Sequence, residues 1–170
     1  IIAPCTAEST DFEALQTRNI STILVNRRVD GWQTDAVSCD NISGAYALID
    51  HLIQLGYRRI AMLSGPEHLS TMQERLHGYR LALAKNALPF DPKLVRCGQM
   101  ETSFGQRCAN QLLDQDEPPT AFFTATDDLS NGVIEALGKR RLRIPHDIAL
   151  VMFGGHAWPT FQFFTHVLEP

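Results

Sequence analysis

The alternation of short apolar runs with amphipathic stretches constrains the fold of this chain more than any other sequence feature. The runs are nearly continuous in apolar residues, as is typical of strands that helices cover on both faces. They cover residues 21–25, 36–39, 59–63, 94–96, 120–123 and 148–153, and residues 1–4 resemble the end of another strand. Single helical stretches separate most of them, which favours right-handed βαβ units. The pattern predicts an α/β fold with parallel sheets flanked by helices.

Helices are predicted where apolar residues recur at three- and four-residue steps between a capping residue and a stop signal. The sequence predicts five helices, over residues 11–18, 42–55, 70–84, 103–113, and from Asp127 or Asp128 to 137. The clearest, 42–55, can be capped by Asp40 or Asn41 and ended by Gly56 in a left-handed conformation. Gly138 should end the last helix.

Composition narrows the class of protein. The 170 residues are 44% hydrophobic and 20% charged, which permits a packed core, and no apolar stretch is long enough to cross a membrane. Because the net charge is −4, we do not expect this segment itself to contact DNA. Four cysteines without paired spacing fit free thiols in a reducing cytoplasm. No signal peptide opens the chain, and the missing initiator Met suggests a fragment or a processed product.

Polar segments directly follow several predicted strands. In a parallel sheet, ligands bind beyond the carboxyl ends of the strands, so these segments are the place to look for a site. They cover residues 26–28, 64–68, 124–128 and 154–158. Their mixture of polar, small and aromatic residues is typical of a cleft for a small molecule.

Three side chains in or near these segments have two interpretations each. Arg75 can bind a sugar diol or a carboxylate in bidentate fashion, or pair with Glu74 or a nearby aspartate on a solvated helix face. Asp127 can hold a ligand hydroxyl or cap its own helix. Trp158 can stack on a sugar ring or fill a hinge pocket. Spacing alone does not choose between them.

No catalytic pattern accompanies these candidates. The chain has no H-E-x-x-H, Walker or G-x-S-x-G motif, and its six histidines lack ligand spacing. The segment Gly154–His156 resembles an oxyanion loop only superficially, because no nucleophile motif accompanies it. We therefore expect no enzyme activity, no metal and no cofactor.

Several short motifs, in this order and spacing, resemble the lactose-repressor/galactose-repressor (LacI/GalR) family of transcriptional regulators. They are DN (40–41), LGYRRIA (55–61), SGP (64–66), ERLHGY (74–79), PPTA (118–121), LRIPHDIALV (142–151) and THVLEP (165–170). The resemblance extends from about residue 1 to residue 170.

The resemblance implies a periplasmic-binding-protein-like (type I) effector domain, in which chain crossovers join two α/β lobes around a ligand cleft. Residues 1–40 would form a truncated N-terminal lobe, residues 41–163 a nearly complete C-terminal lobe, and residues 164–170 a crossover returning toward the N-terminal lobe. An N-terminal lobe of this size would leave sheet edges and apolar faces uncovered. We therefore expect a fragment, or a chain that pairs with another.

The resemblance also assigns residues to the effector cleft. By position these are Asn26, Arg75, Thr126, Asp127 and Gly154, with Trp158 as a further candidate. The family usually has Asn-Asp where this chain has Thr126-Asp127, and Gly-Phe-Asp-Asp where it has residues 152–155. The aspartate missing at position 154 should relax or change the choice of effector.

The function implied is the effector-sensing domain of a cytoplasmic repressor. It would bind a sugar or nucleoside-like molecule and act on operator DNA through a helix-turn-helix headpiece that this chain lacks. A homodimer is expected, with Val133, Ile134 and Leu137 either in its interface or facing the sheet. The alternative is a periplasmic solute-binding protein of a sugar transporter, which has the same fold.

Overall fold

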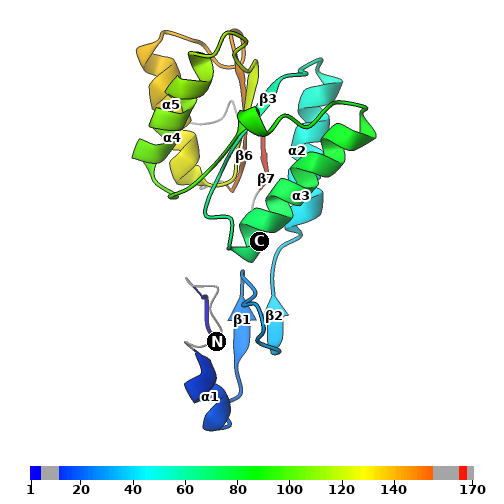
Figure 1. Cartoon of the computed structure of the whole chain (residues 1–170), viewed down its shortest axis with the longest axis vertical. Coiled ribbons are helices and arrows are strands. Elements are labelled where there is room, and N and C mark those ends of the chain that lie inside the picture. Colours follow the sequence, from blue (N-terminus) through cyan, green and yellow to red (C-terminus); the bar gives the residue numbers. More distant parts are fainter. Residues whose placement is uncertain (5–11, 155–164, 168–170) are drawn as a thin grey trace.

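The computed structural model describes residues 1–4, 12–154 and 165–167, and these form a small N-terminal part and a larger C-terminal part (Figure 1). The N-terminal part holds helix α1 (Glu13–Thr17) and the parallel strands β1 (Ile23–Val25) and β2 (Asp35–Val37). Ile2 forms an isolated parallel bridge with Leu24, as the end of a third strand would.

The C-terminal part is built on a five-stranded sheet in the order β4-β3-β5-β6-β7, and every pair of neighbours is parallel. Its strands are β3 (Ile60–Ser64), β4 (Val95–Cys97), β5 (Ala121–Thr124), β6 (Ala149–Phe153) and β7 (Thr165–Val167). The strand order reverses between β3 and β5, which creates a topological switch point at their carboxyl ends. The predicted α/β class and parallel sheet are therefore confirmed.

Helices cover both faces of this sheet, with α2 and α3 on one face and α4 and α5 on the other (Figure 1). Their bounds are α2 (Asn41–Gln54), α3 (Ser70–Lys85), α4 (Thr102–Leu113) and α5 (Asp127–Lys139), and a 3-10 turn, η2 (Pro92–Leu94), precedes β4. Strand β3 shows how the core divides. Ile60 and Met62 pack toward α2 and α3, whereas Ala61 and Leu63 pack toward α4 and α5, and all four are buried.

Two helix ends illustrate one prediction that holds and one that does not. The α2 helix begins at an Asp40 carboxylate that accepts from the Ser43 amide at 2.9 Å, and Gly56 follows its end at φ +96°. The expected stop of α5 at Gly138 is wrong, because the helix continues to Lys139. Arg141 adopts the left-handed conformation there, at φ +58°, and the following amide closes the motif on the Leu137 carbonyl at 3.0 Å.

The N-terminal part buries only one face of its sheet. Leu24 packs with Phe12, Val29 and Trp32, and the rings of Phe12 and Trp32 stack with centroids 4.9 Å apart. On the other face, Ile23, Val25 and Val37 are 37–65% exposed. The predicted uncovered apolar face is therefore confirmed.

The structure bears on two further expectations about the C-terminal part. Thr165–Val167 form an edge strand beside β6, and the other residues of the expected crossover, 164 and 168–170, lie outside the described residues. Val133 and Leu137 are buried in the core between α4, α5 and the sheet, so they do not supply a dimer interface. Ile134 is partly buried against the same core.

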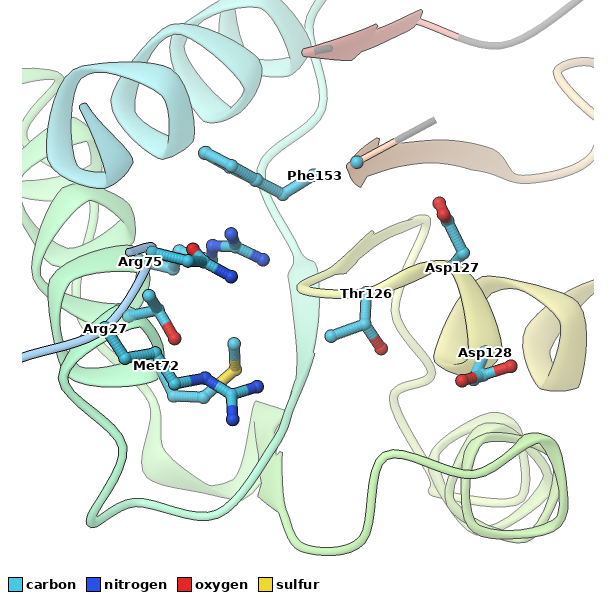
Figure 2. A pocket seen from close by; sticks show the side chains of 10 residues that line it. Arg27, Met72, Arg75, Thr126, Asp127, Asp128 and Phe153 are labelled. Atoms are coloured by element: carbon cyan, nitrogen blue, oxygen red, sulfur yellow. The ribbon is translucent and has the colours of Figure 1, made fainter. Parts of the chain in front are cut away.

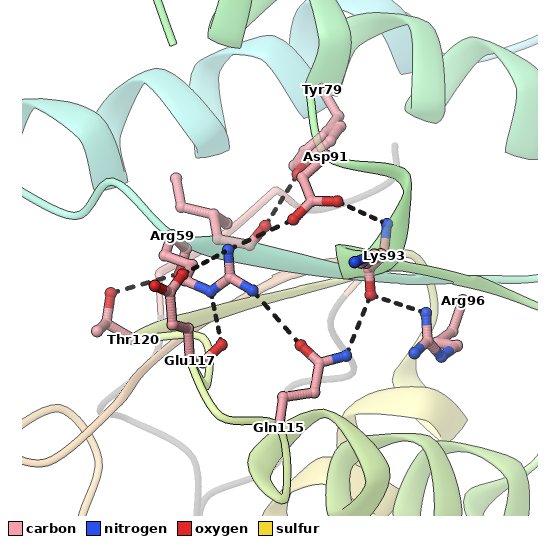
Figure 3. A network of polar contacts seen from close by, with 9 residues as sticks. Arg59, Tyr79, Asp91, Lys93, Arg96, Gln115, Glu117 and Thr120 are labelled. Carbon is pink, nitrogen blue, oxygen red and sulfur yellow. Dashed lines mark hydrogen bonds and ion pairs between the residues drawn. The ribbon is translucent and has the colours of Figure 1, made fainter. Parts of the chain in front are cut away.

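A polar network occupies the amino ends of β3 and β5 (Figure 3). The Arg59 guanidinium contacts the Glu117 carbonyl at 2.7 Å and the Asp91 carboxylate at 3.4 Å, while the buried Tyr79 hydroxyl donates to the Ile60 carbonyl at 2.9 Å. The amide of Thr120 donates to the Arg59 carbonyl at 2.9 Å, which ties the two strands together. This network stabilises the amino end of the sheet, and the segments predicted to hold a ligand follow the carboxyl ends of its strands.

Each helix pair packs through glycine. A Cβ atom added to Gly132 of α5 would lie 2.3 Å from the Thr102 carbonyl and 2.5 Å from the Gln106 amide of α4. One added to Gly78 of α3 would lie 2.3 Å from the Ile42 carbonyl of α2. Since these neighbours are backbone atoms, a side chain at either glycine would force the helices apart.

We predict opposite effects from two alanine substitutions in α5. Gly132→Ala should lower the free energy of unfolding by about 2 kcal/mol, because overpacking against backbone outweighs any gain in helix propensity. Gly138→Ala, where a new Cβ meets no atom within 4 Å, should raise it by up to about 1 kcal/mol. Urea unfolding monitored by circular dichroism measures both, and equal effects would contradict this account of the packing.

Tyr79 should make stability depend on alkaline pH. Burial raises the pKa of its hydroxyl, so the folded chain retains the proton while the unfolded chain loses it near pH 10. This contribution to stability is complete below pH 10 and decreases as the pH rises above it. Unfolding free energies measured from pH 8 to 11 should fall less steeply for Tyr79→Phe than for wild type, and parallel curves would contradict the assignment.

Candidate functional site

A pocket of about 450 Å³ lies at the carboxyl ends of β5 and β6, between α3 and the loop after β1 (Figure 2). Five residues assigned to the cleft from sequence line it: Asn26, Arg75, Thr126, Asp127 and Gly154. Trp158 lies outside the described residues. The structure thus brings together side chains from segments separated by up to 128 positions.

Five further residues line the same pocket and were not among the sequence candidates: Arg27, Thr71, Met72, Asp128 and Phe153. Arg27, Asp128 and Phe153 each adjoin a predicted residue in the chain. Thr71 and Met72 lie four and three positions before Arg75, which places them one turn away on the same face of α3. That helical spacing is the signal that could have found them.

Arg75 is held in a buried position by three elements. It is 3% exposed, its Nε donates to Asn41 Oδ1 at 2.9 Å, and one Nη donates to the Ala125 carbonyl. Its guanidinium lies over the Phe153 ring, 3.7 Å from the centroid. Asn41 in turn donates to Glu74 at 2.7 Å. The interpretation of Arg75 as part of a solvated helix face is therefore wrong.

The start of α5 forms the opposite side of the pocket. Thr126 occupies the N-cap position, so the interpretation of Asp127 as the cap is wrong, since Asp127 is the first helical residue. The Thr126 hydroxyl makes no capping bond, which is unusual for a threonine in this position. Asp127 and Asp128 place two carboxylates in the first turn, where the helix dipole favours negative charge.

Unsatisfied polar atoms concentrate at this pocket. Among the described residues, four buried side-chain nitrogen or oxygen atoms have no hydrogen-bond partner, and three of them belong to the pocket lining: Arg27 Nε, Thr71 Oγ1 and Thr126 Oγ1. Buried polar atoms normally have partners, because leaving one without a hydrogen bond costs about 1–3 kcal/mol. These three atoms are the donors and acceptors that a polar ligand would satisfy.

Gly154 fits a conformation that an aspartate would not adopt easily. Its φ is +110°, and a Cβ atom built there would lie 3.0 Å from Asp127 Oδ1. An aspartate at this position would combine backbone strain with repulsion between two carboxylates. The departure from the family pattern thus removes one carboxylate from this side of the pocket.

Contacts between the two parts of the chain close one side of the pocket. The Arg28 amide of the N-terminal part donates to Ser70 Oγ, at the start of α3, at 2.9 Å. Asn26, which precedes the two arginines, has a left-handed φ of +73°, and its amide bonds to the Val37 carbonyl at 2.7 Å. This turn directs the residues after β1 toward the C-terminal part.

A second pocket of about 410 Å³ lies beyond β3 and β4, and its lining includes Glu67, Arg80 and Cys97. Burial, with the nearby Glu67 carboxylate, raises the pKa of the Cys97 thiol to about 11. The thiol is therefore protonated at neutral pH and is a poor nucleophile.

Within residues 1–4, 12–154 and 165–167, no group of three or more acidic, histidine or cysteine side chains could hold a metal ion. No helix there is both long and apolar enough to cross a membrane.

Comparison with known proteins identifies the family to which the chain belongs. A family model described as a periplasmic binding protein-like domain matches residues 49–162. The HTH-type transcriptional repressor PurR of Haemophilus influenzae (strain PittEE) is 33% identical over 118 residues, which make up 69% of this chain and 35% of that repressor. The chain thus spans about a third of the length of the curated relatives it matches.

Solved structures agree with this assignment. A regulatory protein of the LacI family from Chloroflexus aggregans is 27% identical with a TM-score of 0.85, covering 94% of this chain and 58% of that one. The transcriptional regulator CelR in complex with cellobiose is 31% identical with a TM-score of 0.76, covering 82% of this chain and 43% of that one. The chain therefore belongs to the LacI/GalR family, and its fold is that of the family's periplasmic-binding-protein-like effector domain.

Proposed function

We propose that this chain is the effector-sensing part of a transcriptional repressor. The observation that carries the proposal is the pocket between the two parts of the chain, where a buried arginine and three unsatisfied polar atoms meet. The relatives support it, since PurR is a repressor and CelR has been solved with a bound sugar. The effector would be a sugar or nucleoside-like molecule bound by Asn26, Arg75, Thr126, Asp127 and Gly154.

Binding would act through the two lobes. We assign residues 1–40 to the N-terminal lobe, residues 41–163 to the C-terminal lobe, and residues 164–170 to the crossover that returns toward the N-terminal lobe. A ligand that contacts Asn26 on one lobe and Thr126 on the other stabilises the arrangement in which both contacts are made. Such lobe movement is a hinge-type switch, and its coupling to DNA binding would be reciprocal.

The remaining parts of the proposal concern the whole protein. Operator DNA would be bound by a helix-turn-helix headpiece outside this sequence, in a cytoplasmic homodimer without catalytic activity. A solute-binding protein of a transporter is the competing interpretation. A gel shift with the whole protein separates the two, because only a repressor would bind a specific DNA duplex and change its affinity when the effector is added.

Removing the Arg75 side chain should abolish binding. Arg75→Ala should lower the affinity for an effector identified in a thermal-shift screen of sugars, sugar derivatives and nucleosides by at least 100-fold, because a charged hydrogen-bonding group is lost from a buried site. Arg107→Ala, an exposed arginine of α4, is the control and should bind normally. Unchanged affinity in calorimetry would remove Arg75 from the site.

Thr71 allows binding to be tested without weakening the fold. Because its 1% exposed hydroxyl has no protein partner, Thr71→Val should raise the free energy of unfolding by about 1 kcal/mol. If a ligand uses the hydroxyl, the same substitution should lower affinity about tenfold. Thermal unfolding and calorimetry on one preparation measure both effects, and a stability gain with full affinity would exclude Thr71 from binding.

A further inference from the structure

We infer that the ligand of this pocket carries an anionic group, a carboxylate or a phosphate, which Arg27 and Arg75 bind together. The inference rests on the function proposed above and specifies the chemical class of the effector. Arg27 belongs to the N-terminal part, two positions after the end of β1, whereas Arg75 belongs to α3.

Arg27 lacks the partners that a partly buried guanidinium normally has. One Nη lies 3.3 Å from the Pro4 carbonyl, and the Nε is buried with no hydrogen-bond partner. No carboxylate of the described residues pairs with it, although the chain pairs Arg59, Arg140 and Arg143 with acids elsewhere. A guanidinium edge with an unsatisfied Nε is the geometry that binds carboxylate or phosphate oxygens in bidentate fashion.

The two arginines share one side of the pocket. Figure 2 shows the guanidinium groups of Arg27 and Arg75 directed into it from the side that also carries Met72, while Thr126, Asp127 and Asp128 face them. The Thr71 hydroxyl, buried without a partner in the same lining, supplies a further donor for an anionic oxygen.

The opposite side of the pocket determines how the ligand is oriented and which groups its uncharged part carries. The carboxylates of Asp127 and Asp128 would repel an anion, so the charged group must lie toward the arginines. Carboxylates accept hydrogen bonds from hydroxyl groups, and the unsatisfied Thr126 hydroxyl can donate or accept. The ligand that matches both sides is a polyhydroxylated compound with one acidic end, either a sugar phosphate or a sugar acid.

Matched pairs of compounds test this inference. Wild-type chain would be titrated by calorimetry with glucose, glucose 6-phosphate and gluconate, and with ribose and ribose 5-phosphate, using inorganic phosphate as the bare anion. We expect binding by at least one sugar phosphate or sugar acid, at least tenfold tighter than by its neutral parent. Binding by a phosphate member alone or by gluconate alone identifies which anion the arginines hold.

Variants connect the charge preference to Arg27. Arg27→Gln should weaken binding of the anionic compound at least tenfold while leaving the melting temperature within about 1 °C, because the side chain makes one hydrogen bond within the described part of the chain, to the Pro4 carbonyl. Arg28→Gln is the matched control, since this neighbouring side chain is exposed and not part of the pocket lining, and it should bind like wild type.

Three outcomes would overturn the inference. In the first, a neutral sugar binds as tightly as the corresponding sugar acid or sugar phosphate, and Arg27→Gln does not change its affinity. This outcome leaves the proposed sensing function intact. The second is inorganic phosphate binding as tightly as the sugar phosphates, which removes the sugar from the class. The third is no binding by any anionic compound. Only a further failure of neutral sugars and nucleosides to bind would count against the proposed function itself.

Discussion

The buried guanidinium of Arg75 is the interaction on which the arrangement of the pocket depends. It joins Asn41 at the start of α2, the Ala125 carbonyl after β5 and the ring of Phe153 at the end of β6. A buried charge is stable only when it is paired and hydrogen-bonded, so these partners must stay in place around it. Asn41 also follows the segment that links the two parts of the chain. Arg75 is therefore hydrogen-bonded to the residue that comes directly after that segment.

The sheet supplies the rigid frame for this arrangement. Its polar network around Arg59 binds the amino ends of β3 and β5, and its helices approach closely through Gly78 and Gly132. Among the described residues, the buried side-chain nitrogen and oxygen atoms that lack partners belong to the lining of the pocket beyond the carboxyl ends, apart from Trp32 Nε1 in the N-terminal part. The polar network thus lies at one end of the strands and the proposed ligand site at the other.

Much of this could be predicted from the sequence, because apolar runs with both faces buried and capped amphipathic helices are local patterns. The edge strand β7 could not, since three residues without an apolar run give no such pattern. The end of α5 was mispredicted because Arg141, and not a glycine, adopts the left-handed conformation. The burial of Arg75 depends on Asn41, 34 positions away, and the Arg27 side chain contacts the Pro4 carbonyl, 23 positions away. Such contacts arise only in the folded chain.

The measurement that tests the central claim most directly is hydrogen–deuterium exchange of the chain with and without a compound that raises its melting temperature. The account predicts new protection in four separate segments, residues 26–28, 71–75, 124–128 and 153–154, because these line one pocket. Protection confined to residues 64–67 and 97, at the second pocket, or spread evenly over the chain would contradict it.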